Sequence, residues 1–115
     1  MAKRTPDRFF DLSPKEEAVL SSVLFRERYG LEIIEAVKEA SKGKIQLGFG
    51  SLYPTLHKLE KKGFVTARWG DETSEERGGA RRRYYQITGA GEKALQDKQR
   101  FLEQVAEWQP VGVGG

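Results

Sequence analysis

The chain contains no cysteine and a single histidine, His57. Without cysteine it can form no disulfide, thiol nucleophile or thiolate metal site, and one histidine cannot build a histidine metal cluster or a catalytic pair. The acidic residues between positions 71 and 76 crowd one loop, as is usual for a solvated segment. The glycines at 48 and 50 lack the Gly-Lys-Ser/Thr of a phosphate loop. We therefore expect no metal, no cofactor and no enzymatic activity.

Long apolar runs are also missing from the sequence. No stretch reaches the roughly 18 apolar residues of a membrane-spanning helix, and the N-terminus lacks the apolar segment of a signal peptide. The 115 residues are 37% hydrophobic and 32% charged, a composition that suits one polar but foldable domain. We expect a soluble, cytoplasmic protein with no membrane partner.

The net charge is only +3, but positive charge is concentrated in the middle of the chain. Residues 51–87 carry eight Lys and Arg against five Asp and Glu, whereas residues 1–50 carry nine against eight and residues 88–115 three against four. A positive centre between balanced flanks indicates an anionic partner. It is equally typical of a solvated basic face, so charge alone leaves both interpretations open.

Local patterns predict two helices in the first third of the chain. Residues 13–16, Ser-Pro-Lys-Glu, form a capping-box sequence, and the apolar spacing behind it predicts a helix to about Arg28. A second helix is expected from Leu31 to about Ala40. Residues 45–47 alternate in polarity, which predicts a very short strand that can join a later hairpin.

A third helix is expected to begin at Ser51, its N-cap, and to end before Gly63, its C-cap. Pro54 is then the third helical residue, where its missing N–H is tolerated. The predicted buried stripe consists of leucines at i, i+4 and i+7, namely Leu52, Leu56 and Leu59.

The second half of the chain predicts a hairpin and a last helix. The β-rich runs 64–69 and 82–88 flank a turn-rich segment typical of a long, mobile hairpin tip, and the helix is expected from Gly91 to Trp108. The predicted fold is α+β, mainly α: a winged helix-turn-helix with an appended C-terminal dimerisation helix. We expect an N-terminal extension at residues 1–12 and the winged domain at residues 13–88. The dimerisation helix is expected at residues 89–109 and a flexible tail at residues 110–115.

The uncovered face of the third helix suits the major groove of B-DNA, which admits a helix bearing small, polar and basic groups. Lysines can neutralise phosphates, the Tyr53 hydroxyl can donate, and Pro54 and Thr55 can touch a thymine methyl. An ordinary amphipathic surface is the alternative. The DNA-contacting residues expected on this helix are Ser51, Tyr53, Pro54, Thr55, His57, Lys58 and Lys61.

Arg81, Arg82 and Arg83 stand at the base of the hairpin, where a wing would meet the DNA backbone or minor groove. Because nothing in the sequence gives them a fixed apolar scaffold, we expect them to position the protein rather than to specify sequence. Topology and the arginine triplet together favour double-stranded DNA as the partner. The alternative is a winged-helix module that docks another protein. Such modules lose the basic helix face, which is kept here.

Three segments resemble the PadR family of transcriptional regulators: Tyr29–Ile33, Gly50–Val65 with its Gly-Ser-Leu-Tyr-Pro start, and Arg83–Gly89 with its Tyr-Tyr-Gln-Ile-Thr. The resemblance covers about residues 15–108. It implies a DNA-reading third helix, a basic wing, and a transcriptional regulator, a repressor, that binds an inverted repeat as a homodimer. Ala80 departs from the proline that the family often has in the wing.

The last helix is roughly 25 Å long at 1.5 Å per residue, longer than a three-helix core needs. Its apolar residues include two pairs seven apart, which suits a helix seam, although the helix could instead pack only on its own domain. The resemblance implies dimerisation through this helix and the first one. Short family members bind flat hydrophobic drugs between dimer-related tryptophans, which makes Trp108 a candidate contact for a small hydrophobic effector. The expected dimer interface is Leu95, Phe101, Leu102, Val105 and Trp108.

Overall fold

The computed structural model describes residues 12–71 and 81–112. Most of the predicted extension, most of the hairpin tip including Ala80, and the end of the predicted tail lie outside these residues. Leu12, which we expected to belong to the extension, is 5% exposed and packs into the core. The packed domain therefore includes at least one residue before the first helix.

The first helix, α1 (Pro14–Ser22), begins at the predicted capping box. The Ser13 amide donates to Glu16 Oε1 at 2.8 Å, and the Glu16 amide donates to Ser13 Oγ at 3.1 Å. The expected extension of this helix to Arg28 is wrong, because α1 ends at Ser22 and Val23 is its C-cap. Apolar spacing continues past that point, but the chain leaves the helix to form a strand at residues 28–29.

Three short antiparallel strands form one sheet in the order β1-β3-β2. They are β1 (Arg28–Tyr29), β2 (Val65–Trp69) and β3 (Arg83–Ile87), so the predicted hairpin is confirmed. The third strand is not at residues 45–47, where the chain is irregular. The edge of β3 that such a strand would need is occupied by β1, which pairs Arg28 with Tyr85 and Tyr29 with Tyr84.

Helix α2 (Gly30–Ala40) agrees with the prediction, whereas α3 (Phe49–Lys61) begins earlier than expected, after Gly48 as N-cap. Pro54 is consequently the sixth residue of α3 and not the third. A proline at that depth leaves the carbonyl four residues earlier, that of Gly50, without its helical donor. Gly50 is exposed, so water can hydrate this carbonyl.

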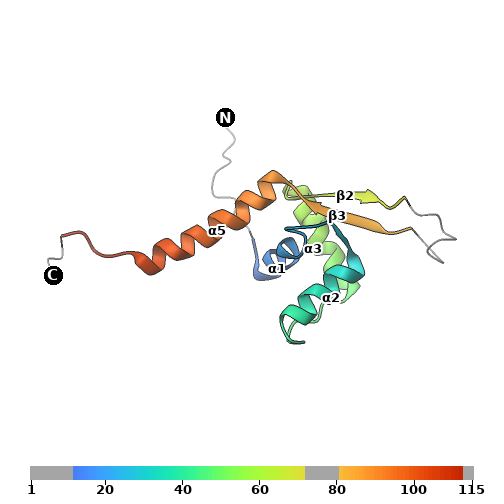
Figure 1. Ribbon diagram of the computed structural model, residues 1–115, viewed down its shortest axis with the longest axis horizontal. Helices are drawn as coiled ribbons and strands as arrows, with labels where there is room; N and C mark the ends of the chain where they lie inside the picture. The colour runs from blue at the N-terminus through green and yellow to red at the C-terminus, as the bar shows by residue number, and fades with distance from the viewer. Residues whose placement is uncertain (1–11, 72–80, 113–115) are drawn as a thin grey trace.

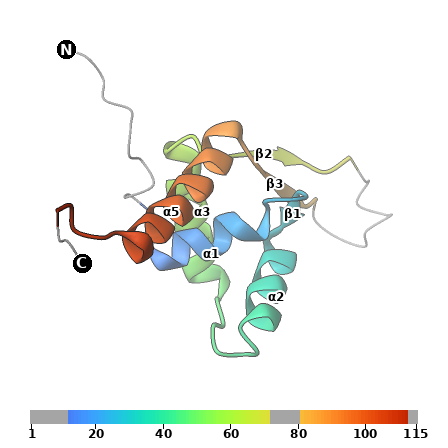
Figure 2. The same cartoon turned by 60° about the vertical axis from the view of Figure 1, so that its left-hand side comes forward.

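The core lies where α1, α2 and α3 meet the inner face of the sheet (Figures 1 and 2). The predicted leucine stripe of α3 is confirmed, since Leu52, Leu56 and Leu59 are at most 1% exposed. Phe64, at the start of the hairpin, is the largest fully buried side chain. Burying α3 along one stripe leaves its opposite side uncovered.

The last helix, α5 (Gly89–Glu107), starts at Thr88, whose hydroxyl accepts a hydrogen bond from the Gly91 amide at 3.0 Å. Ala94 packs into the core, and Lys98 ties the helix to Glu17 of α1 at 3.1 Å. Figure 2 shows α5 running beside α1, and Figure 1 shows its distal half projecting beyond the other elements. Within residues 12–71 and 81–112, no helix is long and apolar enough to cross a membrane.

Candidate nucleic-acid interface

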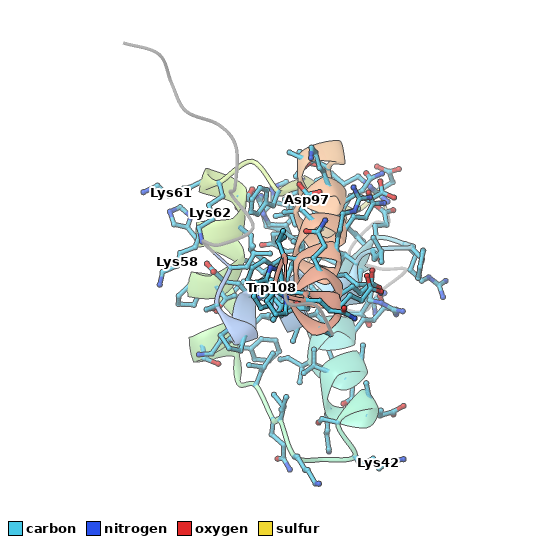
Figure 3. The ribbon with its side chains drawn as sticks, turned by 90° about the vertical axis from the view of Figure 1, so that its left-hand side faces the viewer. Lys42, Lys58, Lys61, Lys62, Asp97 and Trp108 are labelled. Atoms are coloured by element: carbon cyan, nitrogen blue, oxygen red, sulfur yellow. The ribbon has the colours of Figure 1, made fainter. Side chains whose placement is uncertain are left out.

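One side of α3 is free of the core and carries most of the residues predicted to contact DNA. Tyr53, Pro54, His57, Lys58 and Lys61 are all exposed on this side. Figure 3 shows Lys58 and Lys61 projecting from α3 away from α5. A helix with one apolar stripe toward the core and a basic, polar opposite side has the form that fits a major groove.

Tyr53 is held in place although it is 41% exposed. Its ring stacks on Phe49, one helical turn earlier, with centroids 5.8 Å apart and planes 15° apart. Its hydroxyl lies over Gly30, at the start of α2, where an added Cβ would overlap it. The absence of a side chain at Gly30 therefore makes the space in which the tyrosine sits.

The structure does not place Thr55 on the uncovered side of α3. Thr55 is 6% exposed, and its hydroxyl donates to the Ser51 carbonyl at 2.9 Å. The expectation that it touches a thymine methyl is therefore wrong, because Thr55 lies three residues after Leu52 and four before Leu59, on the edge of the buried stripe. Ser51 is half-buried, and its own hydroxyl donates to the Gly48 carbonyl at 3.3 Å.

The lysines at the end of α3 have different roles. Lys62 Nζ lies 3.0 Å from both carboxylate oxygens of Glu16, so it links α3 to the capping box of α1. Burial raises the pKa of Glu16, but hydrogen bonds from Ser13 and the nearby Lys62 outweigh this and hold the pKa below its usual value. The positive charge presented to a partner by this part of α3 comes from Lys58 and Lys61.

The arginine triplet at the base of the wing is ordered by aromatic rings, which contradicts the expectation that it lacks a scaffold. The Arg81 and Arg83 guanidinium carbons lie 5.6 and 5.3 Å from the centre of the Trp69 ring. That of Arg82 lies 4.4 Å from the Tyr29 ring. These are cation–π distances. Trp69 and Tyr29 are site residues that the sequence pattern did not predict, although Trp69 at the end of the first hairpin run, opposite the basic run, was a signal.

A hollow of about 430 Å³ lies between the starts of α2 and α3 and the base of the wing. Its walls include Phe49 and Tyr53 of α3 and the three wing arginines, so the start of α3 and the base of the wing share one surface. Within residues 12–71 and 81–112, no group of three His, Cys, Asp or Glu residues could hold a metal ion. This surface of arginines and aromatic rings is suited to an anionic partner with planar groups, such as nucleic acid.

The residues predicted for the dimer seam divide into two groups along α5. Leu95 and Phe101 are half-buried and pack against the chain's own core. Leu102, Val105 and Trp108 are 53%, 58% and 69% exposed. The distal half of α5 thus presents apolar side chains that its own domain does not cover, with Trp108 at the tip (Figure 3).

A three-helix unit followed by a β-hairpin, with a basic helix face beside a basic wing, defines a winged helix-turn-helix regulator that binds DNA. The family model described as the transcriptional regulator PadR-like family matches residues 19–97. The chain belongs to this family, whose members are transcriptional regulators and not enzymes. The resemblance seen in the sequence is therefore confirmed.

Two individual proteins are similar to this chain over most of its folded part. The chain is 31% identical over 96 residues to an uncharacterized protein of Lysinibacillus sphaericus, covering 84% of this chain and 79% of that protein. It is 39% identical over 71 residues to transcriptional regulator Rv3488 of Mycobacterium tuberculosis, covering 60% of each chain.

Solved structures with the same fold include a transcriptional regulator from Clostridium thermocellum, with a TM-score of 0.66 and 27% identity over 80% of this chain and 85% of that one. A PadR family regulator from Clostridium difficile R20291 has a TM-score of 0.61 and 27% identity over 78% of this chain and 91% of that one.

Proposed function

We propose that this regulator recognises a specific duplex sequence by placing the uncovered side of α3 in the major groove, with the wing on the flanking backbone. The observation that carries this proposal is the hollow in which Tyr53 of α3 meets the wing arginines, with Lys58 and Lys61 exposed farther along the same helix. Lys58 and Lys61 supply phosphate contacts, and Tyr53 and Pro54 face the base edges. Ser51 and His57 lie beside them on the same helix.

The regulator acts as a homodimer joined through α5 and α1. The support is the apolar surface of Leu102, Val105 and Trp108, which a soluble monomer would leave in water. In a two-fold pair each α5 can cover the other, while Leu95 and Phe101 back the seam from the core side. A small hydrophobic effector at Trp108 stays a prediction.

A single reading helix covers only a few base pairs, too few to select one site in a genome. A two-fold dimer doubles the site, and its two α3 helices require half-sites about one helical turn apart, roughly 34 Å, or a multiple of that. The operator is therefore an inverted repeat. Because a dimer seated over a promoter excludes other proteins from that DNA, the regulatory effect we propose is repression.

Fluorescence anisotropy with two labelled duplexes tests this function. One carries the region upstream of the protein's own gene, and the other is a scrambled duplex of equal length. We expect tighter binding to the first, with an affinity that falls with salt at a log–log slope of several units. Equal affinity for both duplexes would refute sequence-specific recognition, and no binding to either would favour the protein-docking alternative.

A further inference from the structure

Glu60 is an acidic residue on the helix that we propose reads DNA. Its carboxylate does not point along the uncovered side of α3 but accepts a hydrogen bond from Arg83 Nη2 of the wing, at 3.4 Å. Both side chains are about one-third exposed, 30% for Glu60 and 35% for Arg83. The pair is therefore a direct polar link between α3 and the wing.

Arg83 is held from two further sides. It pairs directly across the hairpin with Trp69, whose ring centre lies 5.3 Å from the guanidinium carbon. The Tyr85 ring is 5.9 Å away, on the same face of β3. A planar guanidinium can stack on rings and donate to a carboxylate at once, which a lysine cannot do.

The same tryptophan also orients a second arginine. Arg81 lies two residues before Arg83, outside β3, and its guanidinium lies over the same ring. Its guanidinium carbon is 5.6 Å from the Trp69 ring centre, and its Nη2 donates to the Gly70 carbonyl at 3.2 Å. Moving Arg83 would therefore disturb the surface on which Arg81 rests.

We propose that Glu60 is a positioning residue for sequence recognition: through Arg83 and Trp69 it fixes the wing relative to α3. This inference depends on the proposed function, since it concerns how that function's two DNA-contacting elements keep their spacing. A partly exposed ion pair adds little to the stability of a fold. Its effect appears instead in binding, because side chains ordered beforehand need not be ordered when DNA arrives.

The substitution Glu60→Gln gives a test, because a pure charge effect and a positioning effect predict opposite changes in DNA affinity. Removing a negative charge from a surface that binds a polyanion strengthens binding if only charge matters. If Glu60 positions the wing, affinity for the upstream duplex falls about tenfold, or about 1.4 kcal/mol, while affinity for the scrambled duplex stays equal or rises. The matched control is Glu32→Gln in the first turn of α2, for which we expect no loss.

A double-mutant cycle shows whether Glu60 acts through Arg83. Arg83→Lys keeps the charge but removes the planar group that joins carboxylate and rings. In that background Glu60→Gln should cause less than about a twofold further loss, because the link is already broken. Circular dichroism and thermal unfolding of each variant, with wild-type values expected for both, show that the chain is folded.

Two results would overturn the inference while leaving the proposed function standing. The first is a Glu60→Gln variant that binds the upstream duplex as tightly as the wild type or more tightly. The second is full additivity in the cycle. Failure of the wild-type protein to prefer the upstream duplex would instead refute the proposed function, and this would be seen before any variant is compared.

Discussion

Two glycines, Gly30 and Gly91, give a prediction that separates recognition from folding. A Cβ added to either glycine would lie closer than 3.0 Å to an oxygen atom, a distance that real Cβ atoms essentially never show. At Gly30 the oxygen is the hydroxyl of Tyr53, with the ring Cζ at 3.1 Å. At Gly91 it is the backbone carbonyl of Phe64, and the Ile87 Cγ1 atom lies at 2.9 Å.

The nature of the obstacle decides the outcome of each substitution. In Gly30→Ala the tyrosine can swing outward, because its ring is partly exposed and only its end is blocked. The helix gains up to about 1 kcal/mol from replacing glycine, and the lost stacking of Tyr53 on Phe49 costs about 0.5–1.5 kcal/mol. These terms nearly cancel, so we expect a melting temperature close to the wild type.

In Gly91→Ala the obstacle is the backbone of the buried residue Phe64, between α3 and β2, and it cannot move without shifting the core. Overpacking of this kind costs about 1–3 kcal/mol, so we expect a melting temperature lower by at least several degrees. The control is Gly89→Ala in the first turn of α5, where a Cβ would meet nothing within 4 Å. That variant should be as stable as the wild type.

DNA binding completes this comparison. Gly30→Ala should lower affinity for the upstream duplex at least about fivefold, roughly 1 kcal/mol, because it displaces the DNA-facing Tyr53. It does so although it changes no residue on the uncovered side of α3. Thermal unfolding and anisotropy measure the two effects separately. The reasoning is refuted if Gly91→Ala melts with the wild type, or if Gly30→Ala binds the duplex normally.

Further substitutions test the charged and apolar surfaces. Lys58→Ala should reduce the salt slope of DNA binding by about one unit if the lysine meets a phosphate, whereas Lys93→Ala on α5 should leave the slope unchanged; equal slopes would remove Lys58 from the interface. Leu102→Asp should convert a dimer at micromolar concentration into a monomer in sedimentation velocity, since a charge in a desolvated seam is costly. Val111→Asp, beyond the end of α5, should leave the dimer intact, and a monomeric wild type would contradict the seam. The pKa of Glu16 is lowered in the folded state from an ordinary 4.5, so its stabilising effect is present above that pH and is lost as pH falls through the folded value. Glu16→Gln should therefore lower the free energy of unfolding by about 1 kcal/mol at pH 7 and much less at about pH 3, as urea denaturation would show; an equal loss at both values would contradict the ion pair.

Much of the fold could be predicted because it depends on neighbours in the sequence. The capping box at residues 13–16, the leucine stripe of α3 and the two hairpin strands each follow from a local period or a local hydrogen bond. The uncovered lysines at 58 and 61 follow from the same period, since a helix that buries one stripe must expose the other. From these local features the sequence predicts a basic DNA-reading helix beside a wing.

The errors have different physical causes. Apolar spacing continues past Ser22, but whether the chain stays helical depends on β1 pairing with β3, whose residues lie more than fifty positions later. The start of α3 differs because Gly48, not Ser51, caps it. The burial of Thr55 has another origin, since its spacing from Leu52 and Leu59 already puts it on the edge of the buried stripe. The end of α1, by contrast, cannot be obtained from a window of neighbouring residues.

By itself, the sequence determined the elements, the buried stripe and the basic face, because periodicity and capping are properties of a short stretch of chain. The tertiary structure alone decided which charged side chains are paired within the chain. It paired Lys62 with Glu16, 46 positions away, and Arg83 with Glu60, 23 positions away. It also laid the wing arginines on Trp69 and Tyr29. Such contacts join residues that meet only after the chain has folded, since their geometry depends on how the helices and the sheet pack together.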